Sequence, residues 1–148
     1  FSRIMSLKDG SKKMSKSELS DLSRINLTDS KDQIINKIKK AKTDPMPMPN
    51  GLQELDERPE AKNLLGIYAS LTNTTLEKSI ENFSGKNFSE FKESLSEILV
   101  NKIEPISIEI KKLLADQKYL DQILLEGVEK ANLIASKKIQ KIKEIVGF

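Results

Sequence analysis

The 148-residue chain contains no cysteine and no histidine. The absence of cysteine excludes disulfide frameworks and thiol nucleophiles. Without either residue type, the chain cannot form a Cys/His zinc site or use an imidazole for acid–base catalysis. Any chemistry must therefore use lysine, hydroxyl, carboxylate or backbone groups, and a magnesium ion held by carboxylates alone remains possible.

The chain also lacks a long apolar run. None approaches the roughly 20 residues that a helix needs to cross a bilayer, and no signal-peptide pattern is visible. We therefore expect no membrane partner and a cytoplasmic location. Charged residues make up 32% and hydrophobic residues 37% of the chain, which suits one packed domain rather than wholesale disorder. Because the chain begins at Phe1 rather than methionine, we interpret it as a piece of a longer protein whose upstream part is missing.

The net charge of +3 is unevenly distributed. Residues 1–44 carry eleven basic and six acidic side chains, the middle of the chain is acidic, and residues 137–143 are basic again. Two separate basic regions suit a polyanion that contacts both. Ordinary solvated helix faces are the alternative explanation that charge alone leaves open.

Apolar spacing predicts a mainly α-helical bundle after a short N-terminal strand and a polar loop. The strand is expected at residues 2–7 and the loop at 9–20. Proline positions, caps and apolar stripes predict five helices. The first three begin near residue 29 or 30, near 58, and after 74 or 75. The fourth is expected from 88 to about 115, with a kink at Pro105, and the fifth from 117 to about 146.

The same spacing assigns side chains to the core or to solvent. In the first helix, Ile34, Ile35 and Ile38 are expected to face inward, and Lys37, Lys39 and Lys40 outward. Four aromatic residues at helical spacing among apolar neighbours are expected in the core: Tyr68, Phe88, Phe91 and Tyr119. Met46 and Met48, in a proline-rich linker, are expected to pack only modestly.

The loop holds two lysines three residues apart, Lys13 and Lys16, with Ser15 between them and Ser17 after. Two ammonium groups on a short loop can bracket a pyrophosphate, and serine hydroxyls and free backbone N–H groups can add donors. Such lysines accelerate a reaction if they bind phosphate oxygens most strongly as charge develops on the leaving pyrophosphate. For an arbitrary K-x-x-K sequence, a solvated basic loop would be the better interpretation.

The string KMSKS at residues 13–17 resembles the signature loop of class I aminoacyl-tRNA synthetases. With RIMSL at residues 3–7 it is similar to the tryptophanyl-tRNA synthetase family, in its bacterial and organellar branch. RPEAKNLLGIYASL at residues 58–71 and LLEGVEKANLIASKKIQKIKEIVGF at residues 124–148 resemble later parts of the same enzymes. The resemblance covers essentially the whole chain and indicates the C-terminal part of such an enzyme. Residues 9–20 are called the signature loop below.

This resemblance implies the roles of individual residues. Lys13 and Lys16 match the lysines that stabilise pyrophosphate during tryptophan activation. Ile4 and Met14 match positions whose backbone lies near the adenine of ATP. Together with the serines of the motif, the implied ATP-binding residues are Ile4, Lys13, Met14, Ser15, Lys16 and Ser17. ATP is expected as a substrate with Mg²⁺ bound to it, and no metal held by the protein is expected.

The resemblance also implies a division of the chain and its partners. Residues 1–28 would close a Rossmann-type catalytic domain, and residues 29–148 would form a helical region that recognises the tRNA anticodon. Its candidate tRNA-binding residues lie on the last helix: Lys130, Lys137, Lys138 and Lys141. Simple solubilisation of that helix is the alternative. The implied partners are tRNA(Trp), ATP and tryptophan, the latter bound through the missing half, and the full-length enzyme is expected to be a homodimer.

Two other functions remain open at this point. One is the C-terminal part of a tyrosyl-tRNA synthetase, from the same subgroup of class I. The other is a free-standing helical RNA-binding module that keeps the loop and should bind tRNA with strong salt dependence. In the leading interpretation, the chain by itself lacks the amino-acid pocket and the first signature motif, so it should not aminoacylate tRNA.

Overall fold

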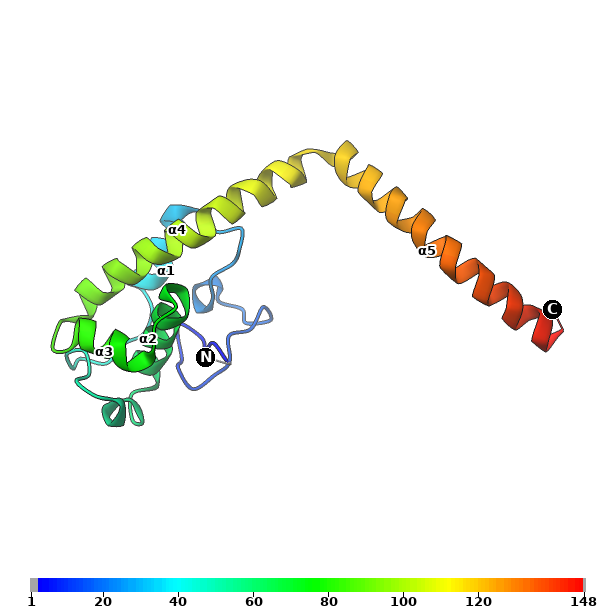
Figure 1. The fold of residues 1–148 in the computed structure, drawn as a ribbon. Coiled ribbons are helices and arrows are strands. Elements are labelled where there is room, and N and C mark those ends of the chain that lie inside the picture. The colour runs from blue at the N-terminus through cyan, green and yellow to red at the C-terminus, as the bar shows by residue number, and fades with distance from the viewer. Residues whose placement is uncertain (1–2, 148) are drawn as a thin grey trace. The chain divides into compact units, whose positions relative to one another are not determined.

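The computed structural model describes residues 3–147 and is mainly α-helical, which confirms the predicted fold class. The helices are α1 (Lys31–Lys39), α2 (Pro59–Thr72), α3 (Leu76–Phe83), α4 (Phe88–Ala115) and α5 (Gln117–Val146), with short 3₁₀ turns η1 (Asp21–Ser23) and η2 (Leu52–Leu55). Figure 1 shows them in chain order. The chain divides into two compact units, residues 1–108 and residues 109–148.

The predicted helix starts are confirmed by their caps. Ser30 caps α1 in a capping box, because its hydroxyl accepts from the Gln33 N–H while the Gln33 side chain accepts from the Ser30 N–H. Pro59 occupies the first turn of α2, where its missing N–H has no cost. The Thr75 hydroxyl accepts from the backbone of Lys78 and begins α3.

The strand predicted at residues 2–7 is wrong for residues 3–7. Residue 2 lies outside the described residues. Within residues 3–7 the backbone makes a single antiparallel bridge, Met5 with Lys13, and no ladder. Leu7 instead bonds to two separate segments: its N–H donates to the Ser23 carbonyl in η1 at 2.9 Å, and its carbonyl accepts from the Lys42 N–H after α1 at 2.7 Å. The backbone N–H and C=O groups of this extended segment therefore find partners on several separate segments. A β-strand would instead pair with one continuous neighbouring strand.

The core of residues 1–108 combines the inner faces of α1 to α4 with Leu7 and Met48. Phe91 is fully buried, and its ring centroid lies 4.9 Å from that of Phe83 in an edge-to-face contact. Tyr68 and Phe88 are partly buried against this cluster, so the core prediction is confirmed for three of its four aromatic residues. The expectation for Met48 is wrong, because its side chain is 1% exposed and fills the core as flexible thioethers often do.

The second unit contains the end of α4 and the 30-residue helix α5. As predicted, Gly147 ends α5 in the left-handed conformation, with φ of 82°. No residue of α5 is buried in the described part of the chain. Tyr119 is 48% exposed, so its assignment to the core is wrong. Helical spacing shows that Tyr119 lies on an apolar face of α5, but spacing alone does not show whether another surface covers that face. None of the helices within residues 3–147 is long and apolar enough to cross a membrane.

Candidate functional site

The signature loop borders an open cavity of about 880 Å³ in the first unit. Five of the six predicted ATP-binding residues contribute to the cavity wall: Ile4, Lys13, Met14, Ser15 and Lys16. Residues 24–28 and Arg3 form the rest of the wall. Ser17, the sixth, follows directly in the exposed loop but does not line the cavity. The tertiary structure thus brings the motif residues together with a segment that sequence reasoning did not identify.

The charge of the cavity wall has one sign. Its charged residues are all cations: Arg3, Lys13, Lys16 and Arg24. Within the described residues, the ammonium groups of Lys13 and Lys16 have no hydrogen bond or ion pair, so both are available to a ligand. A concave surface with several cations and no carboxylate suits a polyanion such as a triphosphate. A second hollow, of about 870 Å³ between α1 and α4, contains none of the motif residues.

Backbone hydrogen bonds hold the start of the motif against residues 3–7. The Met14 N–H donates to the Ile4 carbonyl at 3.1 Å, and the Ser6 N–H donates to the Lys12 carbonyl at 2.8 Å. Ile4 and Met14, the two positions that the resemblance relates to adenine, are therefore directly bonded.

Helix α2 supports the same segment through Asn63. Its Oδ1 accepts from the Met5 N–H at 2.8 Å, and its Nδ2 donates to the Met5 carbonyl at 2.9 Å. Asn63 is 2% exposed, and it satisfies both backbone groups as a neighbouring strand would. The residue next to Ile4 is thus held by a side chain that lies 58 positions away in the sequence. Sequence reasoning missed Asn63 because a lone polar residue in an apolar helix face carries no motif.

We expect Asn63→Ala to lower the free energy of unfolding of the 148-residue chain by about 2 kcal/mol, because two backbone groups lose their partners. Urea denaturation measures this change. Asn82→Ala is the matched control, since Asn82 is an exposed helical asparagine on α3 and its loss should change stability by less than about 0.5 kcal/mol. Equal effects of the two substitutions would contradict the role of Asn63.

The first turn of the signature loop is packed against the start of α2. A Cβ atom at Gly10 would lie 2.5 Å from the Pro59 carbonyl carbon, which leaves room only for glycine. Beside it, Glu60 forms an ion pair with Lys42 at 2.8 Å, and the hydrogen bond from Lys42 lowers the pKa of Glu60. The base of the loop therefore has a fixed position, while the lysines of the motif extend beyond it.

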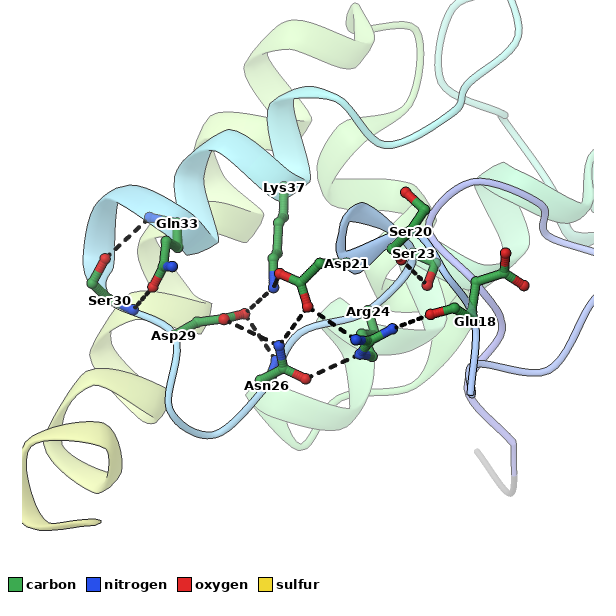
Figure 2. A network of polar contacts seen from close by, with 10 residues as sticks. All are labelled: Glu18, Ser20, Asp21, Ser23, Arg24, Asn26, Asp29, Ser30, Gln33 and Lys37. Atoms are coloured by element: carbon green, nitrogen blue, oxygen red, sulfur yellow. Dashed lines mark hydrogen bonds and ion pairs between the residues drawn. The ribbon is translucent and has the colours of Figure 1, made fainter. Parts of the chain in front are cut away.

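A polar network joins the other end of the loop to α1 (Figure 2). We call Asp21, Arg24, Asn26, Asp29 and Lys37 the Lys37 cluster. The Lys37 ammonium lies 2.7 Å from Asp29 and 2.6 Å from Asp21. Both Lys37 and Asp29 are 3% exposed. Hydrogen bonding from Lys37 lowers the pKa of Asp21.

The predictions that Ile35 faces inward and Lys37 faces solvent are both wrong, because Ile35 is 38% exposed and Lys37 takes the buried position. Lys37 lies three positions after Ile34 and one before Ile38, so helical geometry places it on the buried face of α1. That spacing was the available signal. The charge of Lys37 nevertheless predicted exposure, because a buried lysine is rare unless a carboxylate compensates it. Here two carboxylates, Asp21 and Asp29, come from the segment before α1.

The four lysines predicted to bind tRNA lie on α5 in the second unit, and all are exposed. Lys130, Lys137 and Lys141 fall on one face at spacings of seven and four, and Lys138 is adjacent to that face. These side chains give one side of α5 a basic surface. Their contact with RNA stays a prediction.

Comparison with known proteins finds a family model and relatives that agree with one another. Residues 1–104 match the family model described as tRNA synthetases class I (W and Y). A tryptophan–tRNA ligase of Agrobacterium fabrum is 51% identical over 146 residues, covering 99% of this chain and 41% of the relative. A tryptophan–tRNA ligase of Brucella melitensis is 49% identical with the same coverage. The chain thus spans about two fifths of the length of these relatives.

A solved structure also resembles the chain. The crystal structure of tryptophanyl-tRNA synthetase from Mycoplasma pneumoniae superposes with a TM-score of 0.67 at 27% sequence identity. The superposition covers 99% of this chain and 45% of that chain. Both the sequence relatives and the structural neighbour therefore match this chain along almost its whole length.

Proposed function

Because this chain belongs to the class I tRNA synthetases of the W and Y family, we propose that it is the C-terminal part of a tryptophan–tRNA ligase. The complete ligase would activate tryptophan with ATP and transfer it to tRNA(Trp). The main support is that the chain is 51% identical to such a ligase over 99% of its length. The cationic cavity beside the signature loop has the charge that ATP binding would require.

In the activation step, a carboxylate oxygen of tryptophan attacks the α-phosphorus of ATP, and the bond to the leaving pyrophosphate breaks. Lys13 and Lys16 would bind the pyrophosphate oxygens as negative charge accumulates on them. The backbone at Ile4 and Met14 would position adenine, and the hydroxyls of Ser15 and Ser17 would add donors. Mg²⁺ enters with ATP as part of the substrate.

The helical part would bind tRNA(Trp). Exposed lysines on one side of α5, Lys130, Lys137, Lys138 and Lys141, would contact phosphates and make the affinity strongly salt-dependent. Tryptophan itself would bind to the remaining part of the ligase. The complete enzyme would act as a homodimer.

A graft tests this proposal. We replace the matching 146-residue segment of the Agrobacterium fabrum ligase by this chain and measure tryptophan-dependent ATP–pyrophosphate exchange and charging of tRNA(Trp). We expect exchange and charging within about tenfold of the parent enzyme, since the two segments are 51% identical. The 148-residue chain alone should show no exchange.

Each alternative function predicts a different result. A segment from a tyrosine enzyme should fail in this graft and should work when grafted into a tyrosine–tRNA ligase, charging tRNA(Tyr). A free-standing RNA-binding module should bind tRNA tightly by itself and leave the graft inactive. Either outcome, or exchange catalysed by the chain alone, would overturn the proposal.

A further inference from the structure

The KMSKS motif of the signature loop is held at its two ends by different means. At its start, the bridge between Met5 and Lys13 fixes the backbone. From Ser15 to Leu19, one hydrogen bond in the described structure reaches a residue outside the loop: Arg24 Nη1 donates to the Glu18 carbonyl at 2.9 Å. The remaining bond in this stretch is local, from the Ser17 N–H to the Ser15 hydroxyl. Ser20, the last residue of the loop, is held separately, because its carbonyl accepts from the Ser23 N–H at 3.1 Å and from the Ser23 hydroxyl at 2.7 Å. Between the bridge and Ser20, the position of the loop therefore depends on Arg24.

Arg24 itself is held by two neighbours on its other edges. Its Nη2 lies 3.1 Å from Asp21 Oδ1, and its Nε donates to Asn26 Oδ1 at 3.2 Å. These contacts leave Nη1 directed at Glu18, as Figure 2 shows. A planar guanidinium can make these three contacts together, whereas a lysine ammonium at the end of a flexible chain cannot reproduce the fork.

The neighbours of Arg24 are in turn fixed by buried groups. The Asn26 side-chain amide donates to Asp21 at 2.9 Å and to Asp29 at 3.3 Å, and its backbone N–H donates to Asp29 at 2.8 Å. The Lys37 ammonium pairs with both carboxylates, and the Arg24 guanidinium beside Asp21 supplies the second positive charge. The Lys37 cluster thus forms a rigid support because its central ion pair, Lys37 with Asp29, is excluded from water.

We propose that Arg24 is a positioning residue for Lys16, which it places in the cavity by holding the Glu18 carbonyl two residues further along the chain. Arg24 and Lys16 both line the cavity. The Lys37 cluster orients Arg24, so a buried ion pair between Lys37 of α1 and Asp29 in the segment before α1 determines where the motif lysine lies. The catalytic consequence rests on the proposed function, while the structural consequence does not.

The structural consequence is tested on the 148-residue chain by limited trypsin digestion. Arg24→Gln should raise the rate of cleavage after Lys16 severalfold, while cleavage after Lys13, which lies in the bridge, should change little. Lys92→Gln is the matched control, because Lys92 also donates to backbone carbonyls, those of Lys39 and Ala41, away from the loop. Similar increases in both variants would show a general loss of stability and would overturn the proposal, as would no increase in Arg24→Gln.

The catalytic consequence is tested in the grafted ligase. Displacing a catalytic group by about 1 Å can reduce a rate by up to two orders of magnitude, so we expect Arg24→Gln to lower kcat of the exchange about tenfold or more. The KM for ATP should change less than threefold, because the motif lysines act mainly on the transition state. Arg24→Lys should behave like Arg24→Gln. Full activity of Arg24→Lys would show that only positive charge matters and would overturn the positioning role.

The two experiments separate the two proposals. If the unsubstituted graft is inactive, the proposed function fails, and the digestion pattern alone decides whether Arg24 holds the loop. If the graft is active and digestion of Arg24→Gln is unchanged, the proposed function stands and the positioning role is rejected.

Discussion

Lys13→Ala and Lys16→Ala, each made in the grafted ligase, are expected to reduce tryptophan-dependent ATP–pyrophosphate exchange by about 100- to 1,000-fold. Both side chains line the cationic cavity, and neither forms a hydrogen bond or ion pair among the described residues. Removing a donor aimed at developing charge raises the barrier of the chemical step more than it weakens substrate binding. We therefore expect kcat to fall strongly and the KM for ATP to change little.

Lys12→Ala is the matched control for these two substitutions. Lys12 precedes Lys13, but it pairs with Asp9 at 3.4 Å, its side chain is 74% exposed, and it does not line the cavity. We expect the Lys12→Ala graft to keep exchange activity within about twofold of the unsubstituted graft, because an exposed ion pair contributes little. If all three substitutions reduced exchange equally, general loop charge rather than specific contact would explain the effect.

Phe91→Ala is expected to lower the free energy of unfolding of the 148-residue chain by about 3–5 kcal/mol. Phe91 is completely buried, and its ring packs against Phe83 at 4.9 Å and Tyr68 at 5.9 Å between centroids. Its removal leaves a cavity between α2, α3 and α4 that the surrounding helices can only partly fill. Since domains are stable by about 5–15 kcal/mol, urea denaturation should show a large decrease in the transition midpoint.

The control for Phe91→Ala is Tyr119→Ala. Tyr119 lies on α5 and is 48% exposed, so its truncation should change the unfolding of the first unit by less than about 0.5 kcal/mol. A comparable loss in both variants would mean that Tyr119 is packed in solution and that the sequence-based assignment to the core was right.

Local signals predicted the helices well because each signal acts within a few residues. Ser30 and Thr75 accept from backbone groups three residues later, and Gly147 alone supplies the left-handed turn that ends α5. The KMSKS string likewise identified the two lysines that line the cavity, Lys13 and Lys16. This was possible because the motif lies close in sequence to residues 3–7, the segment it contacts. The predicted division of the chain at residue 28 stays a prediction, since the two units of the structure divide between Ile108 and Glu109.

Long-range partners were not predictable in this way. Lys37 carries the same charge as its exposed neighbours, and only the arrival of Asp21 and Asp29 from the preceding loop makes its burial favourable. No local sequence pattern identifies Asn63 as a supporting residue, because its partner Met5 lies 58 positions earlier in the chain. The strand at residues 2–7 failed for the same reason, because a strand is defined by a continuous partner.

By itself, the sequence determined the helical class, the helix ends and the cationic signature loop, since propensity, capping and residue identity are local properties. The tertiary structure decided which groups hold that loop: Asn63 at Met5, Pro59 at Gly10, and Arg24 at Glu18. These contacts join segments 6 to 58 residues apart. Packing limits competition from water at the partly buried bonds of Asn63, whereas the bond from Arg24 to Glu18 is exposed and depends on how the Lys37 cluster orients Arg24. Chain folding, rather than the motif, therefore sets the position from which Lys13 and Lys16 would act.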